Sequence, residues 1–160
     1  MNELFAPDTL SWGNALLKLA AAIVLPMALG LERFWHRKPM DFRPFVIISL
    51  VACAVLIATL DFPLSGDRTV ESVDATKVMQ GVLTGIGFLG AGAIYREGDY
   101  VKGAGSAASI WSAGVIGLIC GIGELWLAGG VTALILALMF FSEPFTRRWS
   151  NESKGSAEED

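Results

Sequence analysis

Histidine and cysteine are scarce in this sequence of 160 residues, which holds one histidine and two cysteines. His36 lies among arginine and lysine residues, and we expect it to be neither a metal ligand nor a catalytic base. Cys53 and Cys120 lie inside apolar runs, where free cysteines behave as small buried hydrophobic side chains, so we expect no disulfide. The sequence also lacks a Ser/His/Asp arrangement, a nucleophile elbow and a phosphate loop. We therefore expect a protein that is not an enzyme and has no cofactor.

Charged residues are also few, at 18% of the chain against 53% hydrophobic residues, and the mean hydropathy is +0.53. Long runs without charged residues separate the charged segments. A helix needs about 20 residues to cross about 30 Å of hydrocarbon, so five spans would occupy roughly two-thirds of this chain. The sequence therefore predicts an all-α fold, a polytopic membrane bundle of about five transmembrane helices. Because the first run follows neither a basic segment nor a cleavage site, we expect a retained span and not a signal peptide.

The Lys and Arg residues divide unevenly between the two ends of the expected spans. Nine of the 12 fall in segments that we place inside, and two in segments that we place outside. By the positive-inside rule, this asymmetry predicts an external N-terminus and a cytoplasmic C-terminus. We expect Pro144 to end the last helix and a disordered cytoplasmic tail to follow it. The expected segments are an external part over 1–13, a transmembrane domain over 14–142 with spans over 14–31, 44–60, 78–95, 104–121 and 125–141, and the tail over 143–160.

The stretch GVLTGIGFLGAGAIYR, from Gly81 to Arg96, is apolar and carries small residues on two opposite faces. In lipid, small residues let helix backbones approach closely, so we expect this helix at the centre of the bundle, packed on the next span. GIGFLGAG also matches the G-x-G-x-x-G dinucleotide fingerprint, but no strand precedes it and no βαβ unit follows, which favours helix packing. The expected packing residues are Gly81, Gly85, Gly87, Gly90, Gly92, Ser106, Ser109, Ala113, Gly117 and Gly121.

Three single residues interrupt the apolar runs. Lys18 lies near the outer end of the first span, and we expect it to reach water by snorkelling. Pro26 is expected to kink the same span. Trp111 falls in the middle of a span, where its indole N–H needs a partner, so we expect it to face protein, with a lipid-facing side chain as the alternative.

Two stretches, GLER from Gly30 to Arg33 and the residues from Asp74 to Gly123, resemble a known family of membrane proteins. The first is similar to the end of the first helix, and the second to the most characteristic region, of the MgtC/SapB family of bacterial inner-membrane proteins. The sequence DFRPF stands where the family has Gly-Leu-Arg-Thr-His, so Arg43 is the one residue of that motif that is matched. In the later loop, Lys102 stands where the family has Arg. The resemblance implies a multi-pass inner-membrane protein linked to magnesium homeostasis and virulence, here with the membrane domain only.

Two groups of charged residues are candidate sites. The resemblance implies an inner polar patch that could bind an anion, a lipid headgroup or an acidic segment, although Glu32 and Arg33 are equally well explained as an interfacial anchor. The outer acidic residues could bind a divalent cation such as Mg²⁺, but their spacing matches no dedicated cation loop, and a solvated loop with Asp74 at a helix start is favoured. The patch residues are Glu32, Arg33, Arg43 and Arg96, and the weak metal candidates are Asp61, Asp67, Glu71 and Asp74.

Two functions remain open. The resemblance implies a regulator of membrane ion and energy homeostasis that binds a membrane partner, such as the F-type ATP synthase. The other expected partners are the lipid bilayer and, as an open alternative, further copies of the same chain in a homo-oligomer. We expect no nucleic acid as a partner. The alternative is a transporter of Mg²⁺ or another small ion. A transporter needs polar or acidic residues near the bilayer midplane, and the expected spans offer almost none, which favours the regulator.

Overall fold

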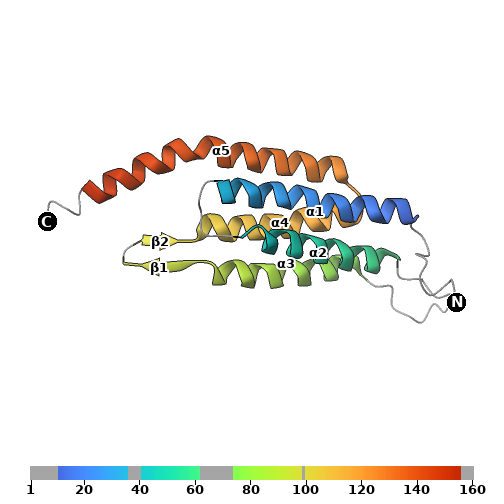
Figure 1. The fold of residues 1–160 in the computed structure, drawn as a ribbon. Helices are drawn as coiled ribbons and strands as arrows, with labels where there is room; N and C mark the ends of the chain where they lie inside the picture. Colours follow the sequence, from blue (N-terminus) through green and yellow to red (C-terminus); the bar gives the residue numbers. More distant parts are fainter. Residues whose placement is uncertain (1–10, 36–40, 62–73, 99, 156–160) are drawn as a thin grey trace.

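The computed structural model describes residues 11–35, 41–61, 74–98 and 100–155. Within these ranges, five helices lie alongside one another and a two-stranded hairpin extends from one end of the bundle (Figure 1). The predicted all-α membrane bundle is confirmed. The elements are α1 (Trp12–Trp35), α2 (Arg43–Asp61), α3 (Ala75–Gly92), β1 (Tyr95–Glu97), β2 (Tyr100–Lys102), α4 (Ala104–Ile122) and α5 (Leu125–Gly155).

Three helices in the described ranges are long and apolar enough to cross a membrane. They cover Trp12–Arg33, Arg43–Leu60 and Ala104–Ile122, and Leu125–Phe141 forms a shorter apolar helix. α3 is less apolar because Lys77 and Gln80 lie in its first turns.

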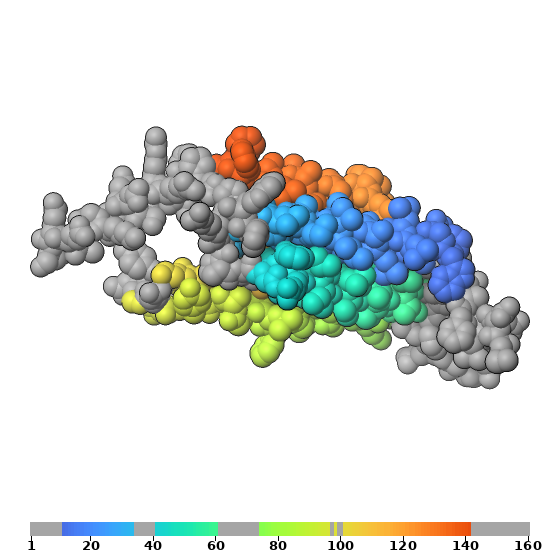
Figure 2. Space-filling view, in the orientation of Figure 1, coloured from blue at the N-terminus to red at the C-terminus, as the bar shows by residue number. Residues whose placement is uncertain are grey.

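α4 is the central helix of the bundle. It packs against α1, α2, α3 and α5, and its buried residues run from Ala107 to Gly121. α3, in contrast, buries only Ile86 and Gly90, and it lies at the edge opposite α5 (Figure 1). Figure 2 shows α1 and α2 side by side on the near face, between these two edges. The expectation that the glycine-rich helix occupies the centre is therefore wrong for this chain.

Small residues on α4 allow its backbone to touch that of α2. A Cβ atom added to Gly117 would lie 2.8 Å from the Cα atom of Ser49, and one added to Gly121 would lie 3.0 Å from the carbonyl oxygen of Cys53. Ala113, on the same side of α4, is fully buried. This close approach gains dispersion energy in lipid, where burial of apolar surface gains little.

Most glycines of α3 point away from the bundle. Gly90 packs on α4, since a Cβ atom there would lie 3.5 Å from the carbonyl oxygen of Ala107. On the outward side, Phe88 is 81% exposed. A Cβ atom would meet nothing within 4 Å at Gly81, Gly85, Gly87 or Gly92.

A β-hairpin replaces the short turn and the last turn of helix expected between the third and fourth spans. α3 ends at Gly92, and the strands pair in antiparallel register with Tyr95 opposite Lys102. Gly103 then has φ +90°, and a side chain there would collide with the carbonyl oxygen of Ala93. Only glycine can make this turn, which brings the start of α4 against the end of α3.

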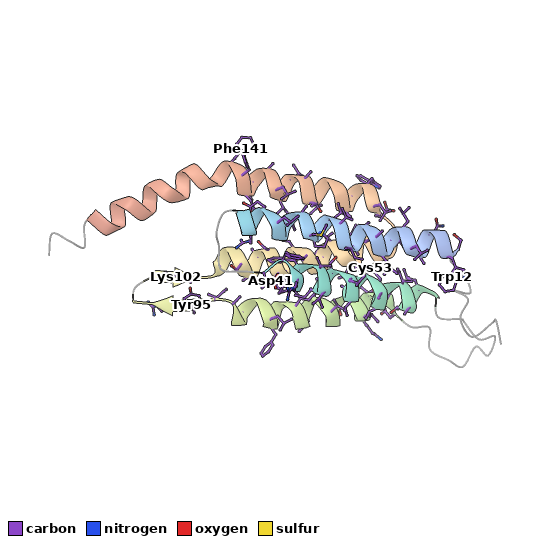
Figure 3. All side chains as sticks on the ribbon, viewed as in Figure 1. Trp12, Asp41, Cys53, Tyr95, Lys102 and Phe141 are labelled. Carbon is purple, nitrogen blue, oxygen red and sulfur yellow. The ribbon has the colours of Figure 1, made fainter. Side chains whose placement is uncertain are left out.

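Pro144 does not end the last helix, because α5 continues to Gly155. A helix-interior proline removes one N–H donor and clashes with the carbonyl four residues earlier, which can bend a helix without ending it. Figure 3 shows the change of direction just beyond Phe141. The expected disordered tail over 143–160 is thus helical as far as residue 155, and residues 156–160 lie outside the described ranges. Trp111 is 46% exposed on the bundle surface, which favours the alternative of a lipid-facing side chain over the expected orientation toward protein.

Candidate functional site

Arg33 lies in the last turn of α1 and is 5% exposed. Its guanidinium group spreads over the first turns of α4. Nε donates to Ser109 Oγ at 3.1 Å, Nη1 donates to Ser106 Oγ at 3.0 Å, and Nη2 donates to the carbonyl oxygen of Gly105. Ser109 Oγ in turn donates to the same Gly105 carbonyl at 2.8 Å. We call Arg33, Gly105, Ser106 and Ser109 the arginine clamp.

The clamp depends on the fixed fork of the arginine side chain, which reaches three acceptors at once. A buried cation is costly unless polar groups surround it, and here two hydroxyls and a carbonyl take that role. The Glu32 carboxylate, whose two oxygens are buried, adds a favourable Coulomb interaction with Arg33. Glycine at 105 leaves room for the guanidinium, since a Cβ atom there would lie 3.2 Å from Nη2.

Lys18 makes a second buried contact at the other end of the same helix pair. It is 9% exposed, and its Nζ donates to the carbonyl oxygens of Gly121 at 2.9 Å and Ile122 at 3.3 Å. The last carbonyls of a helix lack helical donors and carry the negative end of its dipole, so a cation is stabilised there. The expectation that Lys18 snorkels to water is therefore wrong. Arg33 and Lys18 together hold α1 against both ends of α4.

The other two residues of the inner polar patch lie at the surface. Arg43 begins α2, with a side chain that is 75% exposed and its Nε 3.2 Å from Asp41 Oδ2. Arg96 is exposed on β1. The structure thus joins Glu32 to Arg33 within the bundle, whereas Arg43 and Arg96 present their charges to the surroundings.

Asp74 is the N-cap of α3, the alternative that the sequence favoured over cation binding. Its carboxylate accepts a hydrogen bond from the backbone N–H of Thr76 at 2.9 Å. This hydrogen bond lowers the pKa of the Asp74 carboxyl below its ordinary value. Asp61 is the last residue of α2, while Asp67 and Glu71 lie outside the described ranges. Across the described part of the chain, no three His, Cys, Asp or Glu residues gather where they could hold a metal ion.

Sequence reasoning did not predict the carbonyl partners of Lys18. It also did not predict that Ser106 and Ser109 accept hydrogen bonds from Arg33. One signal was available: Lys18 and Arg33 are 15 residues apart, about four helical turns, so they lie near one face of α1. Their partners, about a hundred and about seventy-five residues further along the chain, carry no local signal.

The fold and its buried contacts define an all-α membrane bundle in which two basic side chains fix α1 to the central helix. Residues 19–148 match the MgtC family, which is more than half of the chain, so this protein belongs to the MgtC family. It is 33% identical to an uncharacterized protein of Haemophilus influenzae over 152 residues, covering 93% of this chain and 62% of that protein.

Two relatives that carry the name Protein MgtC have a similar level of sequence identity to this chain. The chain is 31% identical to Protein MgtC of Salmonella typhimurium, covering 76% of this chain and 49% of the relative, and 32% identical to Protein MgtC of Brucella abortus, covering 81% and 51%. This chain therefore spans about half the length of these curated MgtC relatives. No solved structure matches it.

Proposed function

We propose that this protein is a multi-pass inner-membrane regulator of ion and energy homeostasis that acts by binding a membrane partner. The observation that carries the proposal is the nature of the buried charges. Among the described residues, the charged side chains that are at least nine-tenths buried are Lys18 and Arg33, both positive and both bonded to α4. They serve to hold the bundle together.

The same observation weighs against the alternative, transport of Mg²⁺. Magnesium prefers six oxygen ligands in octahedral geometry, supplied largely by carboxylates and water. A cation moving along the α1/α4 contact would meet the buried positive charge of Lys18 at one end and the Glu32–Arg33 pair at the other. Like charges repel most strongly where water is excluded. The link to magnesium limitation is supported by membership of the MgtC family and by two relatives that are named Protein MgtC. Neither of these specifies the mechanism.

Transport and regulation are separated by measuring Mg²⁺ uptake in sealed liposomes that contain the folded protein and an entrapped indicator. The regulator predicts uptake no faster than in protein-free liposomes. Saturable uptake that depends on the protein would refute the regulator and establish transport. Glu32→Gln is the variant to compare, because Glu32 is the acidic member of the inner patch.

Partner binding is tested with two glycine substitutions that differ in their surroundings. Gly85 faces open space, so Gly85→Leu should leave the bundle folded, contrary to the expectation from a central α3. Gly117 touches the α2 backbone, so Gly117→Leu should disrupt the bundle. If α3 presents its outward face to a partner, Gly85→Leu keeps normal thermal stability but loses cross-links to that partner and growth under magnesium limitation. Normal growth with Gly85→Leu would exclude the outward face of α3 as the binding surface.

A further inference from the structure

The β-hairpin carries apolar and basic side chains at the surface of one end of the bundle. Tyr95 and Val101 are each more than half exposed, and Arg96 and Lys102 are exposed beside them. Among the elements that the structure describes, the two strands pack chiefly against each other and not against the helices. Each strand has three residues, and an isolated hairpin is marginally stable in water. The described helices therefore give these apolar side chains little to pack on.

The register of the strands gives both faces of the hairpin the same combination of side chains. Tyr95 lies opposite Lys102, and Arg96 lies opposite Val101. Directly opposite residues project on the same face of a sheet, and successive residues project on opposite faces. One face thus carries a tyrosine and a lysine, and the other carries a valine and an arginine. Glu97 belongs to the next pair, one step further from the helices, so the basic residues lie nearer the bundle than this acidic residue does.

The length of α4 fixes the depth of the hairpin in a bilayer. At about 1.5 Å per residue, the 19 residues of α4 extend about 28 Å, close to the hydrocarbon thickness of about 30 Å. The start of α4, at Ala104, therefore lies near one hydrocarbon boundary. Lys102 is two residues away, and two residues of extended chain reach about 7 Å at most, whereas the headgroup layer on each side is about 5–8 Å thick. Lys102 and Tyr95, side by side just beyond the helix ends (Figure 3), thus lie in the headgroup layer.

Aromatic side chains at the opposite end of the bundle support this depth. Trp12 begins α1 and Trp126 lies in the first turn of α5, and both are more than half exposed. These helix starts lie at the end of the bundle that is remote from the hairpin (Figure 1). Tryptophan and tyrosine are enriched at the two boundaries between membrane and water. Trp12 and Trp126 therefore mark one boundary, and Tyr95 marks the other.

We propose that the hairpin is a lipid anchor, in which Arg96 and Lys102 bind the phosphate groups of anionic phospholipids while Tyr95 and Val101 contact the upper part of the acyl chains. The arginine fork can bind a phosphate through two hydrogen bonds, and lysine binds phosphate as a point charge. The long stems of both side chains cover apolar surface while their charged ends reach the phosphates. Lipid is the occupant that the depth supplies, because a surface left exposed by protein in this layer meets headgroups.

The experiment measures how well lipid shields position 101 from water in the full chain. Val101→Cys provides a thiol for a fluorescent label, and the two native cysteines are fully buried. In nanodiscs of phosphatidylglycerol, we expect the label to be shielded from quenching by acrylamide. Each basic side chain near an anionic lipid surface contributes about fivefold to association, so Arg96→Gln combined with Lys102→Gln should lower the ratio of shielded to exposed label about 25-fold.

Two controls separate loss of lipid binding from loss of the fold. Arg43→Gln removes an exposed charge at the same end of the bundle, but on α2 and beside Asp41, so it should leave the shielding of position 101 unchanged. A label on Leu134→Cys, in the middle of the apolar part of α5, should stay shielded in every variant and every lipid, which shows that the bundle is folded and inserted. In nanodiscs of digalactosyldiacylglycerol, a bilayer lipid without phosphate, the label at position 101 should become exposed.

Three results would overturn the proposal. Equal shielding of position 101 in the phospholipid and in the galactolipid would mean that the hairpin does not bind phosphate. Equal shielding with and without the two basic side chains would mean that they take no part in the contact. A label that is shielded in native membranes but exposed in phosphatidylglycerol nanodiscs would assign the surface to a protein partner.

Discussion

Replacing Arg33 with lysine keeps the positive charge at the end of α1 but removes the planar fork that reaches three acceptors. In the structure, Nε, Nη1 and Nη2 bond separately to Ser109, Ser106 and Gly105. A lysine ammonium is a compact point charge on an unbranched stem and cannot span all three. About two hydrogen bonds from a charged donor are lost, each contributing about 1–2 kcal/mol at a buried site. We expect Arg33→Lys to lower the free energy of unfolding by about 2–4 kcal/mol.

Equilibrium unfolding in mixed micelles, followed by circular dichroism, measures this loss. Arg96→Lys is the matched control, because Arg96 is exposed on β1 and its substitution should change stability by less than about 0.5 kcal/mol. A change of less than about 0.5 kcal/mol for Arg33→Lys would refute the clamp as a stabilising contact. Combining Arg33→Lys with Ser106→Ala should show an interaction energy of about 1 kcal/mol, since the two residues share one hydrogen bond.

Other contacts give further predictions. Lys18→Met should destabilise the bundle by about 1–3 kcal/mol, because the Gly121 and Ile122 carbonyls lose a charged donor; an unchanged thermal midpoint in detergent would contradict this. Gly117→Ala should separate α2 from α4 and lower the midpoint, whereas Gly81→Ala, at an open position, should not; equal effects would argue against the α2/α4 backbone contact. The lowered pKa of Asp74 implies that its contribution to stability is fully present above the ordinary pKa of an aspartate and is lost as pH falls through the lowered value. Asp74→Asn should reduce this acid sensitivity in a pH titration of helix content.

The sequence by itself was sufficient for the class of fold, because hydrophobicity and helix length are local properties of the chain. Uncharged runs marked four of the five helices closely, and Asp74 signalled the start of α3 through a short-range hydrogen bond. Pro144 was a misleading local signal, since a proline can bend a helix without ending it, and α5 continues to Gly155. The hairpin between α3 and α4 also escaped prediction, because its strands are only three residues long.

The tertiary structure determined which helix faces pack against one another. α3 and α4 both carry small residues at helical spacing, yet only α4 is enclosed, because Gly117 and Gly121 meet the α2 backbone while Gly81 and Gly85 of α3 meet nothing. The roles of Lys18 and Arg33 depend on acceptors that folding brings from the two ends of α4. A residue's own helix determines where its side chain projects, but the partner it meets there depends on how distant helices align, and that information is spread over the whole bundle.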